Sequence, residues 1–142
     1  LYSFGDVVKE LAVDDDLSMT FSDESSDFCS LLQYISDKHA QEPTCQTCRL
    51  TIIMSDGICQ EHEQLRQLVN KCLNMRILPF LVIMDPNNKI TDLSHVHFAP
   101  DRSVKFTRYL STIPFEHYVI VKDICHLPVL LSDALQQWFQ MQ

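Results

Sequence analysis

The chain has 142 residues, 46% of them hydrophobic and 21% charged, which suits one globular domain, or a large piece of one, with a sizeable core. Its formal net charge of −8 argues against general binding to nucleic acid or to anionic membranes and suits basic partners or cations. Only two glycines, Gly5 and Gly57, are present, which excludes both a Walker A phosphate loop and a dinucleotide-binding fingerprint.

Signals for membrane insertion or export are not evident in the sequence. No apolar run approaches the roughly 20 residues that a membrane-spanning helix needs. The chain opens with Leu-Tyr-Ser, without a starting Met or a secretory signal, and is expected to be an excised segment. Its six cysteines are expected to be reduced thiols, as in the cytosol or nucleus.

The N-terminal third is predicted to hold one clear helix. Residues 1–5 are typical of the end of a strand that closes on a glycine turn, and residues 6–20 of a loop with a short helix or strand. The polar stretch 22–27 has the chemistry of a helix N-cap, and a connecting loop is expected over residues 39–47. The helix between them carries apolar side chains at helical spacing: Phe28, Leu31, Leu32 and Ile35.

A central strand is predicted at Leu50–Gly57. It opens with five apolar or β-branched residues, carries no charge before Asp56 and ends in Ser-Asp-Gly, a pattern typical of a strand buried on both faces of a parallel sheet. An amphipathic helix over residues 61–76 follows, so Asp56 falls in a strand-to-helix loop. Because open α/β sheets bind ligands beyond the carboxyl ends of their strands, Asp56 is the best single candidate for chemistry.

Two further strands are predicted, at residues 77–84 and 117–122, and they are followed by Asp85 and Asp123. A closing helix begins at about Pro128 and places four large apolar side chains on one face: Leu131, Leu135, Trp138 and Phe139. Strands and helices thus alternate, which predicts an α/β fold, a doubly wound and mostly parallel sheet with helices on both faces.

The segment between the second and third of these strands is predicted to supply the remaining helix. Residues 89–101 look irregular, with a short strand around Val96 and Phe98. Residues 101–113 are typical of a helix whose inward side chains are Val104, Tyr109 and Leu110.

Two groups of oxygen-bearing side chains are candidates for a metal site. Asp56 and the hydroxyls of the Ser22–Ser26 stretch could hold a hard cation such as Mg²⁺, or could simply cap the helices that follow them. Asp14, Asp16 and Ser18 could converge on one ion, although such a charge run is more often a solvated turn.

The remaining reactive side chains give no catalytic pattern. Cys45 and Cys48 form a lone C-x-x-C that lies before a strand, so it fits neither a zinc site nor a thioredoxin-like motif, and a small α/β thiol-redox protein is a distant alternative. His95 and His97 could present two imidazoles on one face of a strand. With no recognisable nucleophile and base, nothing in this segment argues for an enzyme.

The segment from Leu50 to Phe139, about two thirds of the chain, resembles the C-terminal half of a von Willebrand factor A domain. It looks most like the domain at the C-terminus of the giant AAA-type ATPases of large-ribosomal-subunit assembly. The residues that carry the resemblance are 53–59 (IMSDGIC), 80–85 (FLVIMD), 118–123 (YVIVKD) and, most specifically, 127–139 (LPVLLSDALQQWF). On this resemblance residues 1–142 are one von Willebrand A-type domain, or the C-terminal larger part of one.

The resemblance implies a metal-ion-dependent adhesion site (MIDAS) that holds Mg²⁺ or another divalent cation. Such domains use a D-x-S-x-S loop, a Thr loop and a Ser-Asp-Gly strand end. Here Ser3-Phe4-Gly5 looks like the turn before the Thr loop, which leaves Asp56 and Ser26 as ligands and puts the D-x-S-x-S loop before Leu1. In the alternative assignment Asp14, Asp16 and Ser18 are that loop.

The resemblance also implies partners. Ser25, Gly57 and Asp85, with Asp123, would form a rim around the ion, and an acidic side chain of a partner would complete its coordination. The implied partners are the ubiquitin-like domain of a ribosome-assembly factor on pre-60S particles and the AAA ring of the same polypeptide, in the nucleolus and nucleoplasm. No direct contact with nucleic acid or membrane is implied. The alternative is another intracellular von Willebrand A-type interaction domain without a functional metal site.

Overall fold

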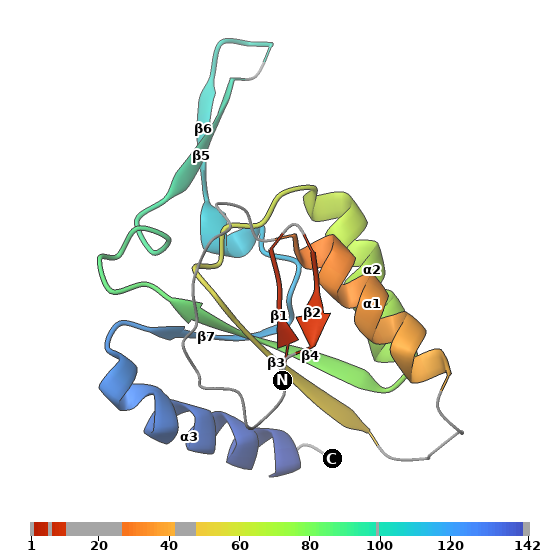
Figure 1. The fold of residues 1–142 in the computed structure, drawn as a ribbon. Helices are drawn as coiled ribbons and strands as arrows, with labels where there is room; N and C mark the ends of the chain where they lie inside the picture. The colour runs from red at the N-terminus through yellow and green to blue at the C-terminus, as the bar shows by residue number, and fades with distance from the viewer. Residues whose placement is uncertain (1, 6, 11–26, 42–47, 99, 141–142) are drawn as a thin grey trace. The chain divides into compact units, whose positions relative to one another are not determined.

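The computed structural model describes residues 2–5, 7–10, 27–41, 48–98 and 100–140 (Figure 1). The chain divides into two compact units. The first consists of Leu1–Thr51 with Cys59–Pro79, and the second of Ile52–Ile58 with Phe80–Gln142. Five of the predicted site residues (Asp14, Asp16, Ser18, Ser25 and Ser26) and Cys45 lie outside the described residues.

The first unit contains a pair of helices and a small strand pair. Strands β1 (Tyr2–Ser3) and β2 (Lys9–Glu10) are antiparallel, and the helices are α1 (Phe28–Ala40) and α2 (His62–Asn74). The helices pack through fully buried side chains, and the Ser36 hydroxyl on α1 lies 3.3 Å from the Cys72 sulfur on α2. Helix α1 begins after Asp27, whose carboxylate accepts the Ser30 N–H, so the predicted N-cap is confirmed.

The central sheet has the strand order β3-β4-β7, with β3 at Arg49–Ser55, β4 at Ile77–Met84 and β7 at His117–Val121. Strands β4 and β7 are parallel, in register from Phe80 opposite His117 to Met84 opposite Val121. All of β4 except Met84 is buried, as its uncharged sequence predicts. The expected α/β fold with a mostly parallel central sheet is confirmed.

Burial of β3 on both faces, which the sequence predicts, is wrong. Ile53 is 3% exposed, but Ile52 and Met54 on the opposite side of the strand are 42% and 46% exposed. Successive side chains point to opposite faces of a strand, and β3 is the end strand of the described sheet. Within the described residues, only the face that carries Ile53 is well covered.

The helix predicted at residues 101–113 is also wrong, because this segment forms a hairpin. Strand β5 (Ser94–Phe98) pairs antiparallel with β6 (Val104–Arg108), and a 3₁₀ turn follows at Tyr109–Ser111. Val104 is therefore 46% exposed rather than inward, whereas Tyr109 is 3% exposed, as expected. The alternation of β-branched or aromatic residues with polar ones from 104 to 108 favours a strand over a helix.

The C-terminal helix α3 (Leu127–Gln140) follows a 3₁₀ turn at Ile124–His126 and packs against β7. It begins one residue before the predicted start and holds Pro128 in its first turn. Leu131 and Leu135 are half-buried and Phe139 is 69% exposed, so the predicted apolar face is covered only in part. No described helix is long and apolar enough to cross a membrane.

Candidate functional site

Three aspartates follow the strands of the central sheet, and all of them belong to the second unit. Asp56 follows β3 after Ser55, Asp85 follows β4, and Asp123 follows β7 after Lys122. The ends of β4 and β7 meet, because the Asp85 N–H donates to the Val121 carbonyl oxygen at 2.9 Å. Gly57 lies against Ile83, so the end of β3 reaches the same edge of the sheet. Ligands of open α/β sheets bind at this edge.

Asp56 is exposed, and its carboxylate organises its own loop. Its Oδ1 accepts the Ile58 N–H at 3.1 Å and lies 3.3 Å from the Ser55 hydroxyl oxygen. Among the described residues its second oxygen, Oδ2, has no hydrogen-bond donor. The N-cap of α2 is Glu61, so the alternative in which Asp56 caps that helix is wrong. The geometry leaves one carboxylate oxygen of Asp56 directed to a ligand or to solvent.

The loop that carries Asp56 is held in place by Gly57 and Tyr109. Gly57 is buried with a φ of 80°, and a Cβ built on it would lie 2.8 Å from Ile83 Cγ2. Its carbonyl oxygen accepts the Tyr109 hydroxyl at 3.1 Å. Only glycine combines this backbone conformation with this close approach to β4. The Asp56 carboxylate is therefore presented from a rigid turn.

The three aspartates differ in burial. Asp85 is 2% exposed; its Oδ1 accepts the Ile90 N–H at 3.2 Å, and its Oδ2 accepts the Thr91 N–H at 3.0 Å and the Thr91 hydroxyl at 2.8 Å. Burial of the carboxylate raises its pKa, but these hydrogen bonds outweigh burial and hold the pKa below its ordinary value. Asp85 thus closes the loop after β4. The rim contact predicted for it stays a prediction.

Asp123 resembles Asp56 in its surroundings. It is exposed, and its Oδ1 accepts the Cys125 N–H at 2.9 Å in the turn that leads to α3. The hydrogen bond from the Cys125 N–H lowers the pKa of this carboxyl group. Asp123 therefore offers a matched comparison for Asp56, since each is an exposed aspartate that accepts an N–H two residues ahead.

Of the expected metal ligands, Asp56 lies among the described residues and the others do not. Within them, no group of three or more His, Cys, Asp or Glu side chains is arranged to hold an ion. Asp56 suits a hard cation, because it is an exposed carboxylate with an oxygen free of described protein donors. Its expected companion Ser26 and the alternative ligands Asp14, Asp16 and Ser18 lie outside the described residues, as does Ser25 of the expected rim.

The other side chains singled out in the sequence are dispersed. His95 and His97 do lie on one face of β5, with ring centroids 6.3 Å apart, and His95 also lies 5.4 Å from the Tyr109 ring. Cys48 is an exposed free thiol, and its C-x-x-C companion lies outside the described residues.

Tyr109 and Thr91 hold the loops of the candidate site in place. Nothing in the sequence near either residue predicts its contact with Gly57 or with Asp85. Tyr109 lies 52 positions from the carbonyl group that it binds, and the bond from Thr91 to Asp85 requires the loop to be folded. The one hint is chemical, since a tyrosine buried in a core needs a partner for its hydroxyl group.

The fold and the strand ends define this chain as an α/β domain with a candidate ligand-binding edge centred on Asp56. In sequence it is similar to midasin from Dictyostelium discoideum, with 32% identity over 122 residues that make up 80% of this chain. It is also similar to midasin from Giardia intestinalis, with 31% identity over 97 residues, or 65% of this chain. We therefore identify the chain as midasin-related. It spans about 2% of the length of each of these relatives, and no protein-family model matches it.

Proposed function

We propose that this chain is the metal-dependent, protein-binding segment of a midasin-like AAA-type ATPase. On this proposal it grips the ubiquitin-like domain of a ribosome-assembly factor, and the AAA ring of the same polypeptide then removes that factor from pre-60S particles in the nucleolus or nucleoplasm. The segment itself binds and does not catalyse. The relationship to midasin and the von Willebrand A-like pattern of residues 50–139 support this proposal.

The observation that carries the proposal is the state of the Asp56 carboxylate. It is exposed, it is held by the Gly57 turn, and its Oδ2 accepts no hydrogen bond from a described residue. Mg²⁺ is bound in proteins through one or two carboxylates and retains several waters. Asp56 would be one ligand of the ion, and the ion would accept an acidic side chain of the partner.

The charge of the chain explains why a cation is needed at this edge. An acidic partner that approaches a chain of net charge −8 is repelled at long range, and its carboxylate would also face the Asp56 carboxylate directly. A divalent ion between the two carboxylates converts this repulsion into attraction. Partner binding at this edge is therefore expected to require the metal.

A second candidate is a von Willebrand A-type interaction domain that binds its partner without metal. It is compatible with the described part of the chain, in which no group of three or more His, Cys, Asp or Glu side chains is arranged to hold an ion. The two candidates differ in one measurable property, which is whether removing the divalent ion abolishes partner binding.

The test measures binding of a fluorescently labelled ubiquitin-like domain to the full-length protein by anisotropy, with Mg²⁺ or with EDTA. Three proteins are compared: the parent, Asp56→Asn and Asp123→Asn. Asparagine keeps one oxygen to accept the loop N–H at either position, while it removes the charge and replaces the second oxygen by an amide NH₂ group. We expect Mg²⁺-dependent binding by the parent, a loss of about tenfold or more in Asp56→Asn, and a smaller loss in Asp123→Asn, because Asp123 is expected at the rim of the ion and not as a ligand.

Equal binding by all three proteins in Mg²⁺ would overturn the role of Asp56 as a ligand. Binding that persists in EDTA would favour the metal-independent module. A loss of binding in Asp123→Asn as large as that in Asp56→Asn would show a general effect of charge at this edge.

A further inference from the structure

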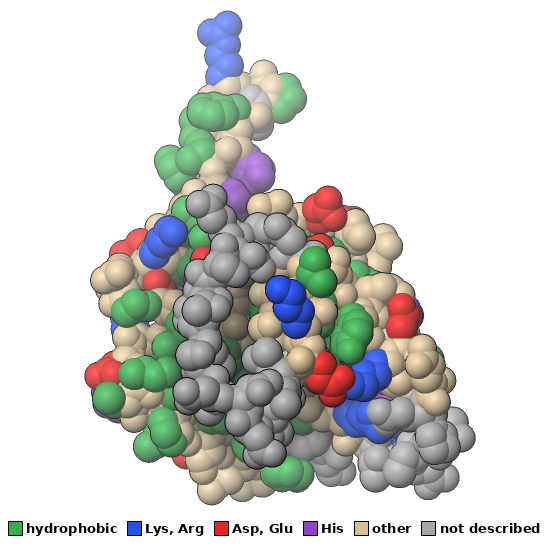
Figure 2. Space-filling model, in the orientation of Figure 1, with side chains coloured by type: hydrophobic (Ala, Val, Ile, Leu, Met, Phe, Trp, Pro, Cys, Tyr) green, Lys and Arg blue, Asp and Glu red, His purple; other side chains and the backbone are tan. Residues whose placement is uncertain are grey.

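The β5–β6 hairpin of the second unit carries an exposed apolar face that the proposed metal site does not use. Every residue of β5 is exposed, as is every residue of β6 except Thr107, and Phe98 and Phe106 are 79% and 73% exposed. Figure 2 shows hydrophobic side chains on this hairpin, with the histidines on its other side. Exposed apolar clusters of this kind usually mark interaction sites.

The register of the hairpin separates its side chains into two faces. Residues that lie opposite each other in an antiparallel pair share a face. Val96 pairs with Phe106 and Phe98 with Val104, so these four side chains form one continuous patch, which we call the hairpin apolar face. The opposite face carries His95, His97, Lys105 and Thr107.

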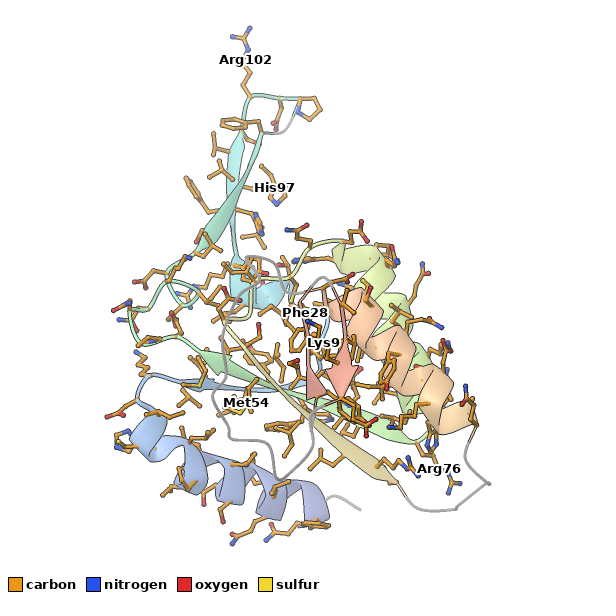
Figure 3. All side chains as sticks on the ribbon, in the orientation of Figure 1. Lys9, Phe28, Met54, Arg76, His97 and Arg102 are labelled. Atoms are coloured by element: carbon orange, nitrogen blue, oxygen red, sulfur yellow. The ribbon has the colours of Figure 1, made fainter. Side chains whose placement is uncertain are left out.

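Positive charge lies at both ends of the hairpin apolar face. Arg108 stands on this face at the base of the hairpin, opposite Ser94. Arg102 extends from the tip, as Figure 3 shows. Residues 94–108 include three of the 11 Lys and Arg of the chain but only one of its 19 Asp and Glu, so the hairpin is basic on an otherwise strongly acidic chain.

The backbone of the hairpin also favours one docking mode. Among the described residues β5 pairs only with β6, which leaves the outer edge of β5 open. Edge strands are usually protected by lysine, proline or a bulge, but Ser94–Phe98 contains neither lysine nor proline. An extended segment can add to such an edge and lay alternate side chains on one face of the sheet.

We propose that the hairpin apolar face is a second docking surface, which binds an extended acidic segment of a partner protein with apolar side chains at alternate positions. The apolar side chains cover Val96, Phe98 and Phe106, and the flanking carboxylates meet Arg108 and Arg102. A protein segment fits better than RNA, because the open edge of β5 offers backbone groups that an extended peptide can pair with. This surface is independent of Asp56 and of any metal.

The test uses the full-length protein and a labelled peptide, Glu-Thr-Val-Thr-Val-Thr-Glu, in EDTA so that the proposed metal site does not contribute. Its Glu and Val side chains share one face when the peptide is extended. Two control peptides replace Glu by Lys or Val by Ser. We expect binding of the first peptide, and binding at least about tenfold weaker for either control.

Protein variants assign the binding to the hairpin. Phe98→Ser combined with Phe106→Ser is expected to weaken binding at least about tenfold without unfolding the protein, because both side chains are exposed. Arg108→Glu is expected to reverse the preference between the acidic and the lysine peptide. His97→Ser, an exposed position on the opposite face, is the matched control and is expected to bind as the parent does.

The proposal is overturned if no peptide binds, if the lysine peptide binds as well as the acidic one, or if the phenylalanine double variant binds normally. Single-stranded RNA and phosphatidylserine vesicles are titrated in parallel. If either of them binds through Phe98 and Phe106 and the acidic peptide does not, the face belongs to that ligand and the proposal fails.

Discussion

At the scale of single residues, Asp85 is the clearest structural anchor at the candidate site. Replacing it with Ala removes three hydrogen bonds and leaves the N–H of the buried Ile90 without its acceptor. We expect a loss of about 2–3 kcal/mol in the free energy of unfolding, measured by urea denaturation at neutral pH.

Asp123→Ala is the matched control for this substitution. Asp123 also accepts an N–H, but it is exposed, so water can replace the lost bond. We expect a cost of about 1 kcal/mol or less. Equal losses at the two positions would show that burial of Asp85 does not decide its contribution.

Gly57 is the second residue whose replacement has a defined consequence. Gly57→Ala forces an alanine to a φ of 80° and brings its Cβ to 2.8 Å from Ile83 Cγ2. We expect destabilisation of about 1–3 kcal/mol, from strain in the turn and displacement of Ile83. Tyr109→Phe, which removes the hydroxyl group that donates to the Gly57 carbonyl oxygen, is expected to cost about 1 kcal/mol. An unchanged denaturation midpoint for Gly57→Ala would contradict the close contact.

These residues also show how far the sequence predicts the site. Asp56, Asp85 and Asp123 have the same local pattern, an aspartate just after a strand rich in apolar residues, and their placement at strand ends is confirmed. Whether each is buried depends on the loop that follows. The loop after Asp85 returns Ile90 and Thr91 to the carboxylate, and no local pattern encodes that return.

At the scale of elements, the sequence predicts best those segments whose residues fit only one type of secondary structure. Strand β4 spans Ile77–Met84 as predicted, because eight uncharged residues followed by Asp-Pro-Asn fit a buried strand and little else. The N-cap of α1 and the apolar stripe of α2 were equally local signals. The prediction that β3 is buried on both faces is wrong, because burial depends on what covers each face of the sheet, and the residues of the strand do not encode this.

The hairpin was missed because two local signals compete in it. Apolar residues at 106, 109, 110 and 113 have helical spacing, while residues 104–108 alternate with a period of two. Pairing with β5 and the turn at its tip decide the outcome. There, the Asp101 carboxylate accepts the Ser103 N–H at 2.9 Å. The partner strand is a tertiary feature that a window of the sequence does not contain.

The exposure of the hairpin leads to a prediction about its local stability. An isolated pair of strands is only marginally stable in water, whereas β4 is buried in the central sheet. We expect the amide hydrogens of residues 94–98 and 104–108 to exchange with deuterium much faster than those of residues 77–84, measured by mass spectrometry. Equal protection would show that the hairpin is already covered in the protein.

At the scale of the whole molecule, the distribution of charge gives the chain two different ways of attracting acidic partners. The chain has a net charge of −8, yet the hairpin is basic, and Asp56 is proposed to bind through a cation. Both surfaces would therefore recognise carboxylates, one through arginines and the other through an ion. Salt should weaken the hairpin contact and chelators the Asp56 contact, so solution conditions distinguish the two surfaces.

The same acidic character sets the response of stability to pH. The pKa of Asp85 is lowered in the folded protein by the hydrogen bonds from Thr91 and Ile90, which outweigh its burial, and that of Asp27 is lowered mainly by the Ser30 hydroxyl. A carboxylate whose folded pKa lies below its unfolded value stabilises the fold above the unfolded pKa. That contribution is lost as pH falls through the folded pKa.

We therefore expect the stabilisation from these two carboxylates to be fully present from pH 7 to about pH 5 and to be lost as the pH falls below the ordinary aspartate pKa of 3.8. Urea denaturation midpoints at pH 7, 5, 4 and 3 measure this dependence. Asp85→Ala should start lower at neutral pH and lose less between pH 4 and pH 3, because the group that becomes protonated in that range is absent. A parallel decline in the parent and the variant would show that Asp85 does not contribute to acid unfolding, whatever its role at neutral pH.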